Sequence, residues 1–302
     1  MSAPPYAGGP PPWIDPSMQT HLHWRDDDIL IAVPPKSGTT WTMNIVHQLL
    51  TGGDGDFADI YAEVPWLEFV TRPGMPRAEL EARIAAMPTT RPRAFKSHGA
   101  PPELPYVAPG AGPRVRYLIV MRNPEEALVS MRPFLEAHSD ELLAAWQVPR
   151  AALSFPDFET FYAGMGKHAL APRLFGFLAA WWPLRHAHNV LCLHYNDMKR
   201  DHEGALRRIA AFLGVTPSAE AWPRILEYTS FAWMKQHSER FDGLSAEIPP
   251  IKPGGMVRQG EAGRAQEEGM TAALAADLRA VAREWCDDEA AIDWMYAGGA
   301  LP

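Results

Sequence analysis

Residues 29–41 have the sequence ILIAVPPKSGTTW and carry the strongest signal in the chain. Its first five residues, 29–33, are apolar and mostly branched, which is typical of a strand buried on both faces of a parallel sheet. A loop follows at once, and a helix is predicted over residues 40–50, ending at Gly52 and Gly53. The stretch therefore predicts a strand-loop-helix unit.

The loop of this unit, PKSGTTW over residues 35–41, has the composition of a phosphate-binding site. Gly38 allows the backbone to approach a ligand, the following helix N-terminus favours negative charge, and Lys36 adds a full positive charge. The nucleoside-triphosphatase loop, G-x-x-x-x-G-K-S/T, is a different motif, because its lysine directly precedes the final hydroxyl residue. An ordinary capped turn is the alternative interpretation.

Three further strands are expected, over residues 93–97, 115–121 and 189–194. The strand over residues 115–121 leads to Asn123 and Pro124, which suit the cap and the first position of a helix. Strands that alternate with helices predict an α/β fold, with a mainly parallel central sheet flanked by helices. Such sheets bind ligands at the carboxyl ends of their strands.

Other helices follow from the 3.6-residue spacing of apolar side chains. One is predicted over about residues 202–213, ending at Gly214, and the last helix of the chain over residues 271–285. The helix after Asn123 is expected to kink or end near Pro133, because proline cannot donate a backbone hydrogen bond.

A single domain is expected, because no repeat or linker divides the chain. Helical insertions are predicted within residues 57–87 and 138–184. Residues 1–20, which begin with a proline- and glycine-rich run, are interpreted as a flexible arm, and residues 21–302 as the domain. The longest strongly apolar stretch, 174–184, is far shorter than the roughly 20 residues that cross a bilayer, so we expect a core helix and no membrane span.

The bulk composition excludes several classes of partner. A formal net charge of −8 argues against nucleic acid as the main partner, because proteins that bind it usually carry a basic face. Cys192 and Cys286 are too few for a disulfide framework and lack metal-ligand spacing. His186 and His188 lack a third ligand, so no metal is expected. Reduced thiols and an N-terminus without a secretory signal favour a cytoplasmic protein.

Several ordered blocks resemble the cytosolic-type sulfotransferases that use 3′-phosphoadenosine 5′-phosphosulfate (PAPS), whose 5′-phosphosulfate loop has the form P-K-S-G-T-T-W. Residues 35–41 match this loop at every position. The other matches, in chain order, are Lys96-Ser97-His98 for the element K-S/T-H, Arg122-Asn123-Pro124 with Ser130 for R-N-P/A…S, Tyr195-Asn196-Asp197-Met198-Lys199 for Y-E-D-M-K, Thr229-Ser230-Phe231 with Met234-Lys235 for T-S-F…M-K, and Arg258-Gln259-Gly260 with Gly263 for part of R-K-G-x-x-G. The resemblance runs from about Ile29 to Gly263.

The resemblance implies a P-loop-like enzyme that moves a sulfonate group from PAPS to a hydroxyl of a small molecule, without a metal. His98 would act as the general base, Lys36 as the electrophilic partner of the donor's bridging oxygen, and Lys96 close to the transferred sulfonate. The implied donor-binding residues are Lys36, Ser37, Gly38, Thr39, Thr40 and Trp41 around the 5′-phosphosulfate, Arg122, Ser130, Arg258, Gln259 and Gly260 around the 3′-phosphate, and Trp41, Tyr195, Thr229 and Phe231 around the adenine.

The late loop departs from the family pattern. Gln259 stands where a basic residue is expected, and residues 264–266, Arg-Ala-Gln, replace Asp-Trp-Lys. Binding of the 3′-phosphate is therefore expected to rely more on Arg122, Ser130 and Arg258, with Arg264 as a further candidate. The dimer segment of many animal members, K-x-x-x-T-V-x-x-x-E, is not recognisable, and the sequence leaves the oligomeric state unknown.

Two alternative functions stay open. A P-loop small-molecule kinase would share the strand-loop-helix unit, but the order of lysine and glycine and the lack of an evident magnesium-binding acidic element disfavour it. A catalytically silent nucleotide-binding module would not explain the presence of both Lys36 and His98.

The acceptor is also open among phenols, steroids, lipid alcohols, sugars and specialised metabolites. Four aromatic residues of the insertions, Trp66, Phe69, Phe134 and Trp146, favour an apolar or aromatic acceptor. Packing in the core is an equally good explanation for them.

Overall fold

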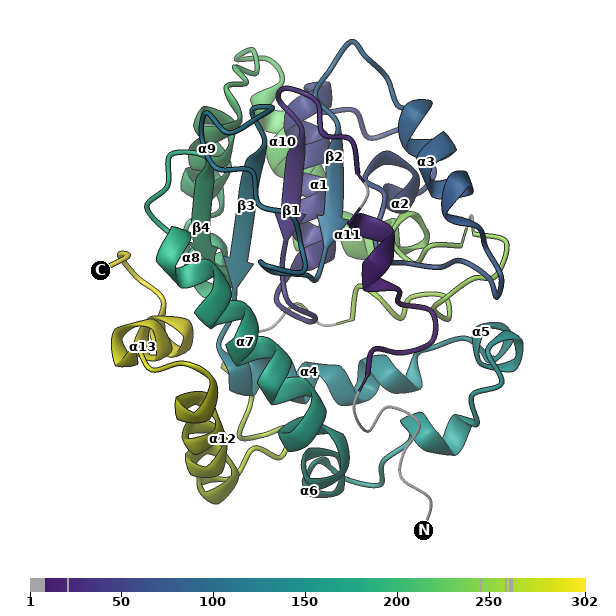
Figure 1. Cartoon of the computed structure of the whole chain (residues 1–302), viewed down its shortest axis with the longest axis vertical. Coiled ribbons are helices and arrows are strands. Elements are labelled where there is room, and N and C mark those ends of the chain that lie inside the picture. The colour runs from purple at the N-terminus through teal and green to yellow at the C-terminus, as the bar shows by residue number, and fades with distance from the viewer. Residues whose placement is uncertain (1–8, 21, 245, 259, 261–262) are drawn as a thin grey trace.

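The computed structural model describes residues 9–20, 22–244, 246–258, 260 and 263–302. Its centre is a sheet with the strand order β2-β1-β3-β4, in which every neighbouring pair is parallel (Figure 1). The strands are β1 (Ile29–Ala32), β2 (Ala94–Ser97), β3 (Arg116–Met121) and β4 (Val190–His194). The predicted parallel sheet is confirmed, and each strand lies within its expected range.

Helices cover both faces of the sheet, because side chains alternate along each strand. Ile29 and Ile31 belong to one apolar core with α1 (Thr39–Thr51), α9 (His202–Leu213) and α10 (Trp222–Tyr228). Leu30 and Ala32 belong to a second core with α4 (Pro124–Glu136), α7 (Ala171–Trp181) and α12 (Ala272–Trp285). The domain is therefore layered, with apolar side chains on both faces of every strand.

Shorter segments complete the chain. The helices are α2 (Ile60–Glu63), α3 (Arg77–Ala85), α5 (Asp140–Ala145), α6 (Phe158–Phe161), α8 (Tyr195–Arg200), α11 (Phe231–Gln236), α13 (Glu289–Ala297), the 3-10 helices η1 (Pro16–Gln19), η2 (Arg150–Leu153), η4 (Trp182–Leu184) and η5 (Ser238–Arg240), and the π-helical η3 (Tyr162–Leu170). The two predicted insertions are thus helical.

The helix ends follow the local signals in the sequence. Asn123 caps α4, and its side-chain oxygen accepts a hydrogen bond from the backbone N–H of Glu125 at 2.9 Å. Gly52 and Gly214 end α1 and α9 in left-handed conformations, as predicted. Helix α4 continues past Pro133 to Glu136 before it ends.

The prediction that the helix over residues 271–285 is the last one is wrong. Helix α13 follows it, and Asp288 caps α13 by accepting a hydrogen bond from the backbone N–H of Ala291. The nine residues of α13 make only about two and a half turns, too few for a 3.6-residue pattern to stand out from the sequence. Tertiary packing stabilises it, since Ile292 and Met295 are fully buried.

Part of the segment interpreted as a flexible arm packs on the domain. Trp13 and Met18 are buried, and the backbone N–H of Val70 donates to the carbonyl of Trp13 at 2.9 Å. Gln19 is buried as well, with its Oε1 3.0 Å from the hydroxyl of Ser97. The packed domain therefore begins before residue 21. Composition alone misses this, because a single tryptophan buries roughly 150–250 Å² and can anchor a proline-rich segment.

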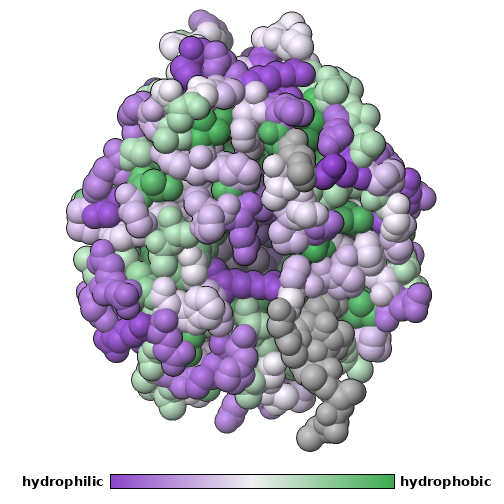
Figure 2. All heavy atoms as spheres, viewed as in Figure 1, coloured by the Kyte–Doolittle hydropathy of each residue, from purple (hydrophilic) through white to green (hydrophobic). Residues whose placement is uncertain are grey.

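The outer surface shows few large apolar side chains. Hydrophilic side chains dominate the face drawn in Figure 2, with apolar ones in small patches between them. Within the described ranges, no helix is both long and apolar enough to span a membrane. Cys192 and Cys286 are both free and buried.

Candidate active site

A cavity of about 1390 Å³ lies at the carboxyl edge of the sheet. Residues that follow each strand line it, among them Lys36 after β1, His98 after β2, Arg122 after β3 and Tyr195 after β4. In the sheet, β2 lies on one side of β1 and β3 lies on the other. The connections that follow β1 and β3 therefore run in opposite directions, away from the point between these two strands. Ligands bind at such switch points in open parallel sheets.

The loop between β1 and α1 presents hydrogen-bond donors to this cavity. Gly38 precedes α1 with a φ of 92°, and no side chain of the described residues caps that helix. The hydroxyls of Ser37 and Thr39 are buried without a partner in the described part of the chain. Buried polar groups and a helix N-terminus left in this state suit an anion, and residues 36–41 fit the phosphate that the sequence predicts there.

Lys36 carries the charge of this loop into a buried setting. Its Nζ lies 4.1 Å from the centroid of the Phe134 ring. Burial, together with the smaller effect of the positive charges of Arg122 and Arg258, lowers the pKa of Lys36 to about 7. An anion bound here would restore the charged form, so the site favours a ligand with negative charge.

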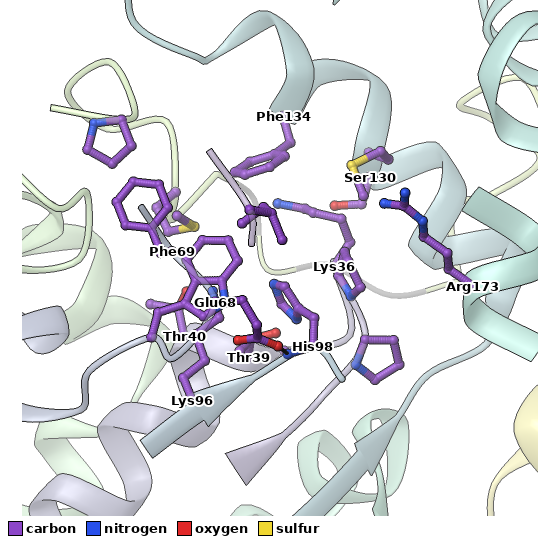
Figure 3. Close-up of a pocket in the computed structure, with 18 of the residues that line it drawn as sticks. Lys36, Thr39, Thr40, Glu68, Phe69, Lys96, His98, Ser130, Phe134 and Arg173 are labelled. Carbon is purple, nitrogen blue, oxygen red and sulfur yellow. Dashed lines mark hydrogen bonds between the residues drawn. The ribbon is translucent and has the colours of Figure 1, made fainter. Parts of the chain in front are cut away.

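Four of the five residues predicted around the 3′-phosphate line the same cavity. Arg122 donates from Nη1 to the carbonyl of Lys36 at 3.0 Å and from Nε to Glu126 at 3.0 Å. Ser130 faces the cavity from α4 (Figure 3), and Arg258 pairs with Glu268 at 3.3 Å. Arg264 and Gly260 line the cavity too, whereas Gln259 lies outside the described residues.

The residues predicted around the adenine lie together at one end of the cavity. Trp41 donates from Nε1 to the carbonyl of Thr229 at 2.8 Å, and its ring meets the Tyr195 ring edge-on at 5.6 Å. The hydroxyl of Thr229 donates to the carbonyl of Ile225, so that side chain fixes the backbone behind Trp41. Phe231 is 43% exposed, which leaves its ring free to stack on a base.

His98 is held in one tautomer by the backbone. Its Nδ1 lies 2.5 Å from the carbonyl of Val33, so Nδ1 carries the proton and Nε2 keeps its lone pair. Burial lowers the pKa of His98 well below its ordinary value, and the positive charge of Lys96 lowers it further. His98 is therefore a neutral hydrogen-bond acceptor at the edge of the cavity.

Lys96 lies beside His98 against aromatic side chains. Its Nζ is 3.1 Å from the centroid of the Trp66 ring, and the side chain is buried. Burial lowers its pKa well below the ordinary value, whereas the charge of Glu68 opposes that shift. The three predicted catalytic residues thus line one cavity.

The remaining wall of the cavity is largely aromatic. Trp66 and Phe69 stack with their centroids 5.1 Å apart, and both line the cavity with Phe134. Trp146 does not line it and packs against the apolar core instead. Of the four aromatic residues noted in the sequence, three therefore face the space available to an acceptor.

Two charged residues of the cavity were missed from the sequence. Glu68 is a buried carboxylate in the apolar run 65–69, Pro-Trp-Leu-Glu-Phe, and Arg173 is the one charged residue in the apolar helix α7. In Figure 3, Arg173 points from α7 toward Ser130; no hydrogen bond or ion pair of the described residues involves it, although the charge of Glu103 raises its pKa. A charge inside an apolar run is the signal that would have singled them out.

Comparison with known proteins agrees with the geometry. Residues 26–290 match the model of the sulfotransferase domain. The chain is 31% identical to sulfotransferase 1A1 of Rattus norvegicus, over 82% of this chain and 80% of the relative, and 30% identical to sulfotransferase 1C2 of Homo sapiens, over 70% and 67%. The chain therefore belongs to the sulfotransferase domain family, and the predicted class of enzyme is confirmed.

Solved structures share the fold at lower identity. The crystal structure of mouse sulfotransferase SULT7A1 complexed with 3′-phosphoadenosine 5′-phosphate (PAP) covers 89% of this chain, with a TM-score of 0.64 and 20% identity over 86% of the mouse chain. Retinol dehydratase in complex with retinol and PAP covers 94%, with a TM-score of 0.62 and 22% identity over 85% of that chain.

Among the described residues, no three His, Cys, Asp or Glu side chains are grouped so as to hold a metal ion.

A substitution at Gly38 tests the shape of the loop. In Gly38→Ala, the new Cβ would lie 2.5 Å from Cδ2 of Tyr195, so the loop or the ring must move. We expect calorimetry to show PAP binding at least about tenfold weaker, since a 1 Å misplacement is costly in such sites. Gly52→Ala is the matched control, because its φ of 72° is also positive but no atom lies within 4 Å of the new Cβ. Equal PAP affinity of Gly38→Ala and the parent would contradict this role.

Proposed function

We propose that this protein transfers the sulfonate group of PAPS to a hydroxyl of a small acceptor with an apolar or aromatic body, and that His98 is the general base. The observation that carries the proposal is the hydrogen bond from Nδ1 of His98 to the carbonyl of Val33. It leaves Nε2 as an acceptor in the same cavity as the phosphate-binding loop. A proton acceptor and an anion site thus share one cavity.

The donor is assigned to the end of the cavity formed by the loop and the arginines. The unpaired hydroxyls of Ser37 and Thr39 and the ammonium of Lys36 suit the 5′-phosphosulfate. Arg122, Ser130, Arg258 and the backbone of Gly260 suit the 3′-phosphate, and we retain Gln259 as a prediction for that group. The adenine would lie between Trp41 and Phe231. Two proteins with this fold were solved in complex with PAP, which is the product of the same donor.

In the proposed reaction, one residue accepts a proton and two lysines stabilise negative charge. Nε2 of His98 takes the proton of the acceptor hydroxyl while that oxygen bonds to sulfur and the bond from sulfur to the bridging phosphate oxygen breaks. Lys36 stabilises the negative charge that develops on the leaving oxygen. Lys96, held near His98, would stabilise the sulfonate oxygens. The membership of the sulfotransferase family favours this reaction over the kinase alternative.

The acceptor would occupy the aromatic end of the cavity. Trp66, Phe69 and Phe134 supply an apolar wall there. Arg173 adds a positive charge to the cavity; burial lowers its pKa, and the charge of Glu103, which also lines the cavity, raises it. We therefore assign to this site an apolar hydroxyl compound that carries an anionic substituent.

Free, buried thiols support a cytoplasmic location.

Loss of Arg122 tests the assignment of the 3′-phosphate. Arg122→Ala should weaken PAP binding by about 1.5–3 kcal/mol, the range for a charge-assisted hydrogen bond. Binding of AMP, which lacks the 3′-phosphate, should change much less. Arg132→Ala is a control on the same helix that does not line the cavity. Calorimetry that finds the same loss for PAP and AMP would remove Arg122 from the 3′-phosphate site.

Loss of His98 tests the mechanism. His98→Asn should lower turnover of an alcohol acceptor by about 10²- to 10⁴-fold and leave the PAP dissociation constant unchanged. His188→Asn, an exposed position outside the cavity, is the control. A base acts only when neutral, and the pKa of His98 is lowered, so the parent's rate should fall only below pH 6.5. A parental rate in His98→Asn would refute the role.

Loss of Arg173 tests the class of acceptor. We expect Arg173→Gln to lower kcat/KM for 3-(4-hydroxyphenyl)propionate at least about tenfold, because a charge-assisted hydrogen bond is lost. For 4-ethylphenol, which has a similar body and no charge, the change should stay within about threefold. Equal changes for the two acceptors would show that Arg173 does not recognise the anionic group.

A further inference from the structure

We infer that Glu68 is a positioning residue for this reaction, which holds the turn that aims His98 into the cavity. The inference rests on the proposed role of His98 as the base. Glu68 lies 30 positions before His98, in the first insertion, and is 3% exposed. A buried carboxylate is costly unless it is hydrogen-bonded, so its contacts indicate why it is there.

One oxygen of Glu68 collects hydrogen bonds from three consecutive residues. Oε1 accepts from the hydroxyl of Ser97 at 2.5 Å, from the backbone N–H of His98 at 2.9 Å and from the backbone N–H of Gly99 at 3.1 Å. All three partners are donors, which an ionised carboxylate oxygen can satisfy together. The turn after β2 is thus built around a single atom.

This turn sets the direction of the imidazole. The hydroxyl of Ser97 also accepts from the backbone N–H of Gly99 at 2.7 Å, which closes the turn on the other side of His98. With the backbone fixed at both ends, Nδ1 of His98 reaches the carbonyl of Val33 and Nε2 is left for the acceptor. A shift of the turn would break this bond and release both the tautomer and the ring direction.

Glu68 is itself fixed from several sides. Its neighbour Trp66 pairs with Lys96 in an isolated parallel bridge, and its own carbonyl accepts from the backbone N–H of Asp15 at 2.8 Å. Burial raises the pKa of Glu68 above its ordinary value, and the hydrogen bonds from Ser97 and His98 and the charge of Lys96 offset only part of that shift. The second oxygen, Oε2, is buried without a partner among the described residues. The carboxylate therefore acts mainly through Oε1.

Two substitutions separate the hydrogen bonds of Glu68 from its charge. Glu68→Gln keeps an oxygen acceptor at Oε1 and loses the charge, whereas Glu68→Asp keeps the charge but retracts it by about 1.5 Å, one carbon–carbon bond. We expect kcat on an alcohol acceptor to stay within about threefold in Glu68→Gln and to fall about tenfold to hundredfold in Glu68→Asp. Each variant is measured at its own pH optimum, because loss of the carboxylate charge lowers the pKa of Lys96, which Lys36 also lowers.

The reverse order, with Glu68→Gln impaired and Glu68→Asp near the parent, would overturn the inference in favour of a purely electrostatic role. Loss of PAP affinity in both variants would overturn it as well, since the donor site should be untouched. Should Glu68→Asp fail to fold, a loss of more than about tenfold in kcat of Glu68→Gln still counts against the positioning role, because the acceptor atom is retained there.

A double-mutant cycle links the effect to His98. If Glu68 acts through the imidazole, Glu68→Asp should cost nothing further in the His98→Asn background. Full additivity of the two losses would show that Glu68 acts elsewhere. A His98→Asn protein with parental turnover would instead refute the proposed base, so the two failures are distinguishable.

Discussion

Strand β1 pairs in parallel with β2 on one side and with β3 on the other, and this pairing fixes where the site and the covering helices lie. Parallel strands end at the same edge, so residues from four distant segments reach one cavity. The same pairing makes each strand apolar on both faces and requires helices on both sides. The topology thus produces both the double core and the single site.

The site places several positive charges in a buried setting, where the loss of solvent destabilises the charged forms. Lys36, Lys96 and Arg122 all line the cavity, and burial lowers the pKa of both lysines. Glu126 pairs with Arg122, and Glu68 lies beside Lys96. The ammonium of Lys36 lies over the Phe134 ring, and the positive charges of Arg122 and Arg258 lower its pKa. This arrangement costs stability in the free protein and favours an anionic ligand, as is common for functional sites.

Much of the fold could be predicted because its signals are local. The strand, the glycine and the helix of residues 29–51 are adjacent in the sequence. Branched side chains favour the strand, Gly38 can adopt a positive φ because it has no side chain, and the first N–H groups of the helix have no partner within the helix. The start of α4 at Asn123 and the ends of α1 and α9 at Gly52 and Gly214 are also encoded locally. Helix α13 escaped prediction because it is short and is stabilised by burial rather than by its own pattern.

The strand-loop-helix unit, the alternation of strands and helices that predicts a parallel sheet, and the motifs of the family can all be read from the sequence, because each signal is a short block of neighbouring residues. By contrast, the contact of Glu68 with the turn at His98, the position of Arg173 at the cavity and the packing of Trp13 on the domain are seen only in the folded structure. These contacts join segments that are far apart in the sequence. They depend on how helices and insertions pack around the sheet, and local propensities carry no information about contacts between distant segments.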